Sequence, residues 1–396
     1  MTALANGNKR ALLRLSAGSY ATAIVARNAA NRVLSMDLDG FFSHAFLLFF
    51  KADADDEFHL SPRHTVLDVA VVPPGRGTSG AIRAQIGFLY RALRLIRRHR
   101  VVAIQANDPY VTGFNALLLS RLTGIPYVIE VVDAYDLSQA AGGYRYIPLV
   151  SSRAFEKKVE RTVLRQAHAV YADRDFYVKY ALANGARPAH THRVRCVTDP
   201  FYYTAGPQRP LSAYVDTAGR KVMLYVGGLR PCKNVIDLVP CLARVRSAGE
   251  DVVLVIVGDG PLRADIEQRA TELGVRDSLA MLGHRSAQEL VDIMHCSDVL
   301  LAPHAGYALI EMALSGKPIV AYDYEWHPEV VQHERTGLLA KYGDAEALGD
   351  QALRVLRNPD LARSLGQAAR EFVLANHDCP GAIQDERHMY EQLIGA

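Results

Sequence analysis

The stretch Glu311-Met-Ala-Leu-Ser-Gly-Lys317, followed by Pro318-Ile-Val-Ala321, places an acid within an almost entirely apolar pattern. It predicts a short buried helix that ends at Gly316 and leads into a buried strand. Burying a carboxylate without partners costs several kcal/mol, and a broken packing rule of this kind often marks a functional site. We therefore expect Glu311 to face a ligand that offers hydroxyl groups. The alternative is a glutamate that reaches solvent on the far side of its helix.

The composition is that of a globular protein with room for two domains. The chain has 396 residues, of which 49% are hydrophobic and 22% charged, and this length favours two domains. The first 100 residues carry 14 basic and 7 acidic side chains, whereas the whole chain has a net charge of +3. A basic first domain favours anionic surfaces, of which membranes are one kind.

The cysteines and the hydropathy indicate a cytoplasmic protein. Five cysteines lie far apart without CxxC or Cys/His spacing, which is typical of free thiols and argues against a structural zinc site. The first ten residues lack the apolar region of a signal peptide, and no apolar run is long enough to cross a membrane. The apolar run 41–50 is expected to be a core segment.

Short β-rich runs alternate with longer helical patterns, which is typical of parallel α/β sheets. The expected strands are 11–16, 65–71, 101–105, 127–132, 169–172, 193–198, 222–226, 252–257, 279–282, 299–302 and 318–321. The expected helices are 82–99, 111–123, 153–166, 234–247, 261–273, 286–296, 306–315, 328–334 and 345–356. Residues 17–60 are hard to assign, and Pro240 predicts either a kink in its helix or a later start.

A stretch with Pro and Gly at 203–220 predicts the domain boundary. We expect two Rossmann-like, doubly wound α/β domains that face each other across a cleft. The first is expected at 1–205 and the second at 206–377, with a helix at about 378–396 packing back on the first. Ligands of such folds bind at the carboxyl ends of the strands.

Two glycine-containing turns follow strands of the second domain. In Val226-Gly-Gly-Leu-Arg-Pro-Cys-Lys-Asn234, the N–H groups of Gly227 and Gly228 and the cations Arg230 and Lys233 are suited to a diphosphate. The alternative is a merely polar turn. In Val257-Gly-Asp-Gly-Pro261, Gly258 would let backbone approach a ligand, although a sharp turn into a helix with an early proline explains the same residues.

A third turn, Pro303-His-Ala-Gly-Tyr307, leads into the helix that contains Glu311. The peptide groups at Gly306 and Tyr307 open this helix, where N–H groups bind phosphate or sugar oxygens. Glu311 lies about one turn deeper, where its carboxylate can accept two hydrogen bonds from a vicinal diol such as a ribose. Cations for a diphosphate and an acid for a ribose together predict a nucleotide-diphosphate site.

The second half of the chain, about 222–375, resembles the retaining GT-B glycosyltransferases of group 1, often called family 4. The matching stretches are Leu254-Val-Ile-Val-Gly-Asp-Gly-Pro-Leu-Arg263, Met281-Leu-Gly-His284, Glu289-Leu-Val-Asp292, Ser297-Asp-Val299, Ala308-Leu-Ile-Glu-Met-Ala-Leu-Ser-Gly-Lys-Pro-Ile-Val-Ala321, Pro328-Glu-Val-Val331 and Thr336-Gly-Leu-Leu339. The first half is more diverged, and its best matches to the family are Asp108-Pro-Tyr110, Gly124-Ile-Pro-Tyr-Val-Ile-Glu-Val-Val-Asp133 and 153–172. The resemblance implies a GT-B architecture.

The resemblance also implies roles for individual residues. Lys233 matches a lysine that contacts the donor diphosphate, and Glu311 matches the second glutamate of a Glu-x7-Glu motif, which binds the ribose. The arginine usual in the first turn falls on Gly228, and Arg230 is the candidate to replace it. The first glutamate falls on Pro303, beside His304. The frequent acceptor-side histidine falls on Val132, beside Asp133.

The reaction implied is transfer of a hexose from a nucleotide sugar with retention at the anomeric carbon. The expected acceptor is a glycan, a lipid-linked molecule or a small molecule, as in polysaccharide biosynthesis. The nucleotide sugar is a co-substrate, and we expect no cofactor and no metal. Asp133, His304 and Glu311 are the candidate catalytic residues, and Asp133 or His304 would orient hydroxyl groups. Further donor contacts are expected at Gly283, Ala308 and Leu309.

Two other functions stay open from the sequence. The missing glutamate and histidine are compatible with an inactive homologue that binds a nucleotide sugar or a glycan-assembly partner. A GT-B-like epimerase is a third possibility. Transfer assays with nucleotide-binding measurements separate the inactive homologue, and release of an altered free sugar identifies the epimerase.

The segment 82–100 has the pattern of a basic amphipathic helix. Ile82, Ile86, Leu89, Leu93 and Ile96 recur every three or four residues, and six arginines lie between or after them. Such a helix can lie on anionic lipid at the inner face of the membrane, although packing of the apolar stripe on the sheet is the simpler explanation. Nucleic acid is not an expected partner, because aromatic and basic residues do not alternate as a stacking surface requires.

Overall fold

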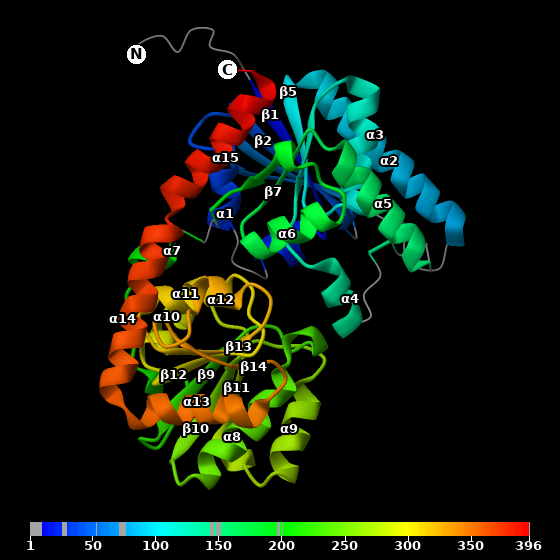
Figure 1. Ribbon diagram of the computed structural model, residues 1–396. Coiled ribbons are helices and arrows are strands. Elements are labelled where there is room, and N and C mark those ends of the chain that lie inside the picture. The colour runs from blue at the N-terminus through cyan, green and yellow to red at the C-terminus, as the bar shows by residue number, and fades with distance from the viewer. Residues whose placement is uncertain are drawn as a thin grey trace. The chain divides into compact units, whose positions relative to one another are not determined.

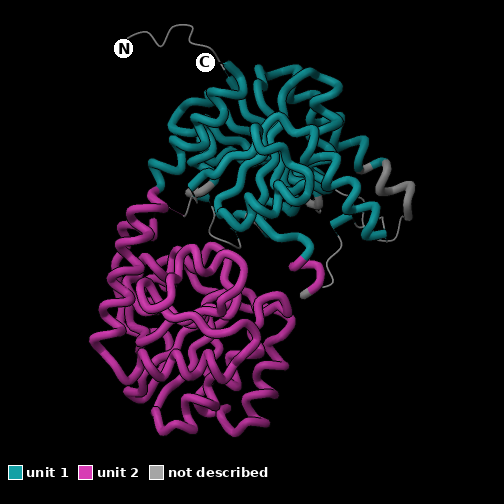
Figure 2. Tube along the Cα trace, in the orientation of Figure 1, with its two compact units in different colours: residues 1–136, 144–197, 379–396 teal, residues 137–143, 198–378 magenta. Residues whose placement is uncertain are grey.

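The computed structural model describes residues 10–25, 30–52, 54–70, 77–142, 146–147, 152–195, 199 and 201–395. The chain forms two compact units (Figure 2). Unit 1 comprises Met1–Asp136, Tyr144–Val197 and Cys379–Ala396, and unit 2 comprises Leu137–Gly143 and Thr198–Asp378. Unit 2 thus begins before the expected residue 206. One reason is helix α7 (Phe201–Thr204), which the sequence did not predict and which contacts α11 (Ala308–Leu314).

Unit 1 is built on an eight-stranded sheet with the order β3-β4-β2-β1-β5-β6-β7-β8 (Figure 1). Its strands are β1 Ala11–Ala17, β2 His44–Ala52, β3 Asp56–Ser61, β4 His64–Ala70, β5 Val101–Ala106, β6 Tyr127–Glu130, β7 Ala169–Ala172 and β8 Thr191–Arg193. Neighbouring strands are parallel except β3 and β4, which form an antiparallel edge. Most of the apolar run 41–50 lies in β2, where Phe46, Leu48 and Phe49 are buried.

The helices of unit 1 include a C-terminal helix far away in the sequence. They are α1 Ala30–Leu34, α2 Gly77–Arg98, α3 Val111–Thr123, α5 Arg153–Gln166, α6 Asp175–Ala183 and α15 Cys379–Ile394, while α4 Tyr135–Gly142 starts in unit 1 and belongs to unit 2 from Leu137 on. Met389 and Tyr390 of α15 share a hydrophobic core with Leu12 and Val128 of the sheet. The Tyr390 hydroxyl also donates a hydrogen bond of 3.1 Å to the Gln105 side chain. The C-terminal helix therefore belongs to the core of unit 1.

Unit 2 contains a six-stranded, fully parallel sheet with the order β11-β10-β9-β12-β13-β14. Its strands are β9 Lys221–Val226, β10 Val252–Val257, β11 Leu279–Gly283, β12 Val299–Ala302, β13 Ile319–Asp323 and β14 Leu338–Lys341. The strand order reverses at β9, which lies between β10 and β12. Ligands of doubly wound sheets bind at such a switch point, outside the carboxyl ends of the strands.

The helices of unit 2 cover a continuous apolar sheet. They are α7 and α11, together with α8 Leu238–Ser247, α9 Arg263–Glu272, α10 Ala287–His295, α12 His327–Val330, α13 Ala345–Arg357 and α14 Pro359–Asn376. Residues of α8, α9 and α13 share one core with alternate residues of the strands, such as Leu254 and Ile256. Pro240 lies in the first turn of α8, which begins later than expected, and a proline there removes no helical hydrogen bond.

Several expected boundaries were wrong. The last strand of unit 1 is Thr191–Arg193 rather than 193–198, of which 196–198 and Cys196 lie outside the described residues. Helix α12 is only four residues long, because the chain turns at Val331. The prediction omitted β14 and α14. The start of α14 does carry a signal, since Asn358 caps the helix by accepting a hydrogen bond from Leu361 N–H and a proline follows.

Candidate functional site

Three loops of unit 2 leave the carboxyl ends of neighbouring strands at the switch point. The loop after β9 carries Lys233, the loop after β12 carries His304, and the loop after β13 carries Glu325. The order β9-β12-β13 makes these strands direct neighbours (Figure 1). These loops are therefore the place in unit 2 where the fold favours a ligand.

The loop after β9 lies directly against the loop after β10. Gly227 N–H donates to the Val257 carbonyl at 2.9 Å, and Leu229 N–H donates to the Asp259 carbonyl at 3.0 Å. A Cβ atom on Gly258 would lie 2.0 Å from the Gly227 carbonyl oxygen, and the φ of Gly258 is 135°. Close packing of two loops thus requires glycine at 258, whether or not a ligand binds there. The donor contact expected at Gly258 stays a prediction.

The two cations of this loop differ in exposure. Arg230 is exposed, whereas Lys233 is half-buried in a short helical turn, Pro231–Lys233. Lys233 lies close enough to the buried His327 to help lower its pKa. Gly228 has room around it, since an added Cβ would meet nothing nearer than 3.8 Å. Of the two cations, Lys233 is thus the one held within the fold of the site.

His304 connects two of the three loops. Its side chain is buried, and Nδ1 donates a hydrogen bond to the Cys232 carbonyl in the loop after β9. Its Nε2 lies 3.5 Å from Oε2 of Glu325 in the loop after β13. Both ring nitrogens therefore face protein groups. The role suggested from the sequence, orienting a substrate hydroxyl, stays a prediction.

The sequence places Glu311 on a buried helix, where it is expected to face a ligand. Glu311 is half-buried, whereas the other residues of α11 after Ala308 are buried. The acid thus occupies the partly open side of its helix. Burial and the charge of Glu311 raise the pKa of Tyr202 in α7. Glu311 therefore lies near α7, neither enclosed in the core nor fully in solvent.

The remaining donor-site candidates surround these loops. Gly283 ends β11 with a φ of 70°, which favours glycine, and its carbonyl accepts a hydrogen bond from Gly258 N–H at 2.9 Å. Gly306 is exposed, and an added Cβ would meet no atom within 4 Å. Tyr307 and Ala308 are half-buried, and the fully buried Leu309 side chain leaves only its backbone to contact a ligand.

The buried, neutral His327 holds two backbone segments next to these loops through hydrogen bonds, a role that the sequence did not indicate. Its Nδ1 donates to the Tyr322 carbonyl at 3.0 Å, and its Nε2 accepts from Ala305 N–H at 3.1 Å. Burial, followed by the nearby His304 and Lys233, lowers the pKa of His327 to about 3. An imidazole with one donor and one acceptor nitrogen therefore fixes the backbone between β12 and α11.

Replacing His327 by phenylalanine is expected to destabilise the protein. The loss is about 1–3 kcal/mol for each backbone group left unpaired. The unfolded imidazole binds a proton near pH 6.5 and the folded one only near pH 3, so acid favours unfolding through this group. The wild type should therefore lose stability from pH 6.5 towards pH 3 more steeply than His327→Phe. Denaturant unfolding across this range checks it. Equal slopes, or the same change in a variant of the exposed His388, would contradict the assignment.

Asp133 lies in unit 1, in the turn after β6, and is half-buried. It lies near Tyr135, because burial and then the charges of Asp108 and Asp133 raise the pKa of that tyrosine. Asp108 itself accepts hydrogen bonds from Tyr110 N–H at 2.8 Å and from the Thr112 hydroxyl at 2.6 Å. Asp133 therefore belongs to a polar turn of unit 1, while His304 and Glu311 belong to unit 2.

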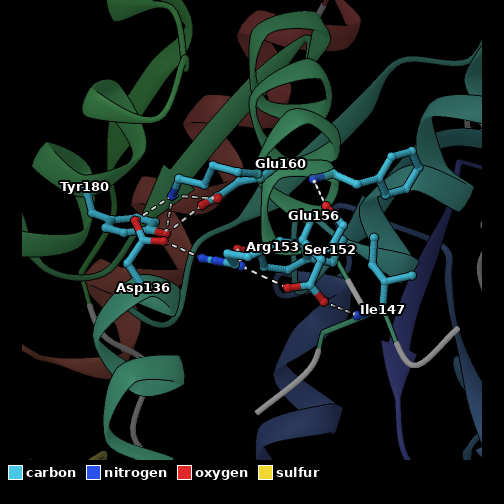
Figure 3. Close-up of polar contacts among 10 residues, drawn as sticks. Asp136, Ile147, Ser152, Arg153, Glu156, Glu160 and Tyr180 are labelled. Atoms are coloured by element: carbon cyan, nitrogen blue, oxygen red, sulfur yellow. Dashed lines mark hydrogen bonds and ion pairs between the residues drawn. The ribbon is translucent and has the colours of Figure 1, made fainter. Parts of the chain in front are cut away.

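A charge cluster on α5 holds this part of unit 1 in place (Figure 3). Its members are Asp136, Arg153, Glu156, Lys157, Glu160 and Tyr180. Arg153 contacts Asp136 and Glu156, and Glu156 also accepts a hydrogen bond of 2.8 Å from Ile147 N–H. Lys157 contacts Asp136 at 2.5 Å and Glu160 at 2.7 Å. The cluster fastens the start of α4 and the segment at 147 to α5.

Among the described residues, no group of three or more His, Cys, Asp or Glu side chains could hold a metal ion. No disulfide joins the described cysteines Cys232, Cys241, Cys296 and Cys379. None of the described helices combines the length and the apolar character that a membrane span requires.

Comparisons with known proteins fit this geometry. Residues 214–372 match the family model described as "Glycosyl transferases group 1", and residues 18–196 match the model described as "Glycosyl transferase 4-like domain". The N-acetyl-alpha-D-glucosaminyl L-malate synthase of Bacillus anthracis is 30% identical over 202 residues, which are 50% of this chain and 52% of that protein. The alpha-D-kanosaminyltransferase of Streptomyces kanamyceticus is 23% identical over 292 residues, or 71% of this chain and 74% of that protein.

A solved structure extends the likeness to the whole fold. The crystal structure of Anabaena Alr3699/HepE in complex with UDP has a TM-score of 0.74 and 18% identity, and the match covers 97% of this chain and 100% of that one. The chain spans about half the length of the Bacillus relative. The resemblance to group 1 and family 4 type glycosyltransferases and the predicted GT-B class with two α/β domains are thus confirmed.

Proposed function

The chain belongs to the glycosyltransferases of group 1 and family 4 type, with a GT-B fold, and from that premise we propose that it transfers a hexose from a nucleotide-diphosphate sugar with retention of anomeric configuration. The acceptor proposed is a glycan, a lipid-linked molecule or a small molecule. A role in polysaccharide or glycan biosynthesis follows from the family. We propose no metal and no further cofactor.

The observation that carries the proposal is the placement of Lys233 and Glu311. Lys233 follows β9 and Glu311 follows β12, and these strands are neighbours at the switch point of the sheet. A cation and an acid on adjacent strand ends match the two ends of a ribose-diphosphate unit. The Anabaena neighbour was solved with UDP, which makes UDP the first nucleotide to test.

In the proposed reaction, the bond between the sugar and the diphosphate breaks through an oxocarbenium-like transition state. Negative charge then develops on the departing diphosphate. Lys233, the exposed Arg230 and the peptide groups near Gly306 would stabilise that charge, and preorganised donors of this kind supply a large part of many rate enhancements. Glu311 would hold the ribose, and Asp133 would orient an acceptor hydroxyl.

The test is a thermal-shift screen across nucleoside diphosphates and their sugars, followed by transfer assays with the best donor. A ligand that binds only the folded state raises the melting temperature. We expect one nucleotide class to stand out and the product to keep the anomeric configuration of the donor, read by NMR. An inverted product would refute retention. Binding without transfer to any of a broad set of acceptors would favour the inactive homologue.

A specific observation on α2 supports membrane contact as part of the proposal. The buried side of the helix is formed by Phe88 and Ala92, whereas Ile86 is 62% exposed and Tyr90 is 63% exposed. The expected packing of the apolar stripe on the sheet therefore fails at Ile86. The Ile82 side chain lies outside the described residues.

The same helix borders a basic pocket of about 640 Å³. Its lining includes Arg91, Arg94 and Arg98 of α2, together with His44 and His99. Exposed apolar side chains beside cations are suited to the surface of an anionic bilayer. We therefore propose a peripheral location at the inner face of the membrane.

The double variant Ile86→Ser/Tyr90→Ser is expected to reduce binding to vesicles of anionic phospholipid about tenfold or more, because it removes two exposed apolar anchors. Flotation with vesicles of anionic and of neutral lipid measures this. Leu122→Ser, which changes an exposed leucine on α3, is the matched control. Wild-type protein that does not float, or that floats equally well with neutral lipid, contradicts the membrane proposal.

A further inference from the structure

The loop after β13 buries a carboxylate beside the candidate donor site. The Glu325 side chain is 1% exposed, and its backbone has a left-handed φ of 49°. A residue with a Cβ adopts this conformation at a cost of about 1–2 kcal/mol. Strained backbone of this kind clusters at active sites and ligand clamps, where the surrounding structure holds it in place. The position therefore calls for an explanation beyond a simple turn.

The partners of the Glu325 carboxylate are few. Both oxygens are buried and neither has a well-formed hydrogen bond to a described residue, but the carboxylate lies close to the Tyr324 hydroxyl, where burial and then the charge of Glu325 raise the pKa of that tyrosine. The ion pair that the structure provides is with His304, whose Nε2 lies 3.5 Å from Oε2. Since a buried carboxylate is stable only beside compensating charge, this contact has to carry much of the compensation. The neighbouring Tyr324 packs edge-on against His304 with ring centroids 5.2 Å apart, which confines the imidazole.

His304 transmits this contact to the loop that carries Lys233. A carbonyl oxygen only accepts hydrogen bonds, so the contact with Cys232 requires a proton on Nδ1. An attractive contact with a carboxylate requires a proton on Nε2 as well. Glu325, His304 and Cys232 form a chain of contacts across three loops, and Cys232 directly precedes Lys233.

We infer that Glu325 is a positioning residue for sugar transfer: through His304 it fixes the Cys232 carbonyl and thereby the placement of Lys233 against the donor diphosphate. The inference rests on the proposed function, because it takes Lys233 as the diphosphate ligand. Pro303 stands at the position where the resembling family has its first glutamate, and Glu325 places a carboxylate in the loop after the next strand.

Glu325→Gln tests the inference, because it keeps the size of the side chain and removes its charge. We expect kcat/KM for the donor to fall about 10- to 100-fold, as expected for a displaced binding group. Affinity for a nucleoside diphosphate such as UDP should weaken, while affinity for the nucleoside alone stays unchanged. His304→Gln should give the same pattern. A residue that only supports the fold would lower the melting temperature without this selectivity for the diphosphate.

The decisive measurement combines Glu325→Gln with Lys233→Met. If Glu325 acts through Lys233, the double variant should lose little more activity and diphosphate affinity than Lys233→Met alone. The inference would be overturned if the activity loss of the double variant equalled the product of the losses of the two single variants. An unchanged kcat/KM in folded Glu325→Gln would also overturn it. Should Glu325→Gln not fold, the combination of His304→Gln with Lys233→Met decides by the same criterion.

The matched control is Glu334→Gln. Glu334 also has a left-handed φ, 61°, and belongs to the same unit, but its side chain is 58% exposed and pairs with Arg354. We expect wild-type kinetics from it. A wild-type protein that neither binds a nucleoside diphosphate nor transfers a sugar would instead refute the proposed function, so the two failures are distinguishable.

Discussion

Replacing Lys233 by methionine is expected to lower kcat for the preferred nucleotide sugar by about 10²- to 10³-fold. Loss of one preorganised donor to a developing negative charge has this effect in other enzymes. Lys233 is half-buried within the loops of the site, so neither water nor the exposed Arg230 takes its place readily. Steady-state kinetics with the best donor measure the change. The loss should appear mainly in kcat, because charge on the diphosphate grows as its bond to the sugar breaks.

Lys221→Met is the matched control for this experiment. Lys221 begins β9 and Lys233 lies in the loop that follows β9, so both variants remove one positive charge from the same unit. The Lys221 side chain is 45% exposed and pairs with Glu250, a surface contact that contributes little to stability. We expect near wild-type turnover from Lys221→Met. Equal losses in the two variants would mean that net charge matters and that Lys233 has no special role.

The sequence was most informative where the fold is local. Buried parallel strands appear as continuous apolar runs, and the run at 252–257 coincides with β10 to the residue. Val111–Thr123 and Arg153–Gln166 were predicted with the bounds that the structure gives. The loop with Lys233 and the turn that leads into the helix of Glu311 were identified because turn chemistry and charge follow directly on such strands.

Contacts between distant segments could not be predicted from the sequence. His304 and Cys232 are 72 residues apart, and their contact depends on the strand order β9-β12. Nothing in the letters Tyr324-Glu-Trp326 indicates that the acid turns inward in a left-handed conformation. The charge cluster on α5 could not be predicted for the same reason, since Asp136 and Arg153 come into contact only through tertiary packing.

The structure also shows where periodicity misleads. In α2, the apolar spacing pointed to a buried stripe through Ile86, but Phe88 and Ala92 occupy the buried side. In α11, the flanking apolar residues suggested that Glu311 is enclosed. The sequence of such a helix does not show which of its sides the neighbouring elements leave uncovered. Apolar spacing defines which residues are able to pack, while the contacts of the helix decide which of them do.

Replacing Glu311 by alanine is expected to weaken donor binding about 10- to 150-fold for each ribose hydrogen bond lost, because bonds to a charged acceptor contribute about 1.5–3 kcal/mol. The half-buried position of Glu311, on the open side of α11, allows this change with little loss of packing. Calorimetry with the preferred nucleoside diphosphate and with its 2′,3′-dideoxy analogue isolates the ribose contact. Wild type should prefer the ribose form, and Glu311→Ala should bind both forms equally. Glu371→Ala, at an exposed position of α14, should keep the wild-type preference. If Glu311→Ala still prefers the ribose form as strongly as the wild type, Glu311 does not hold the ribose, and the acid of α11 would have to be assigned to another part of the donor.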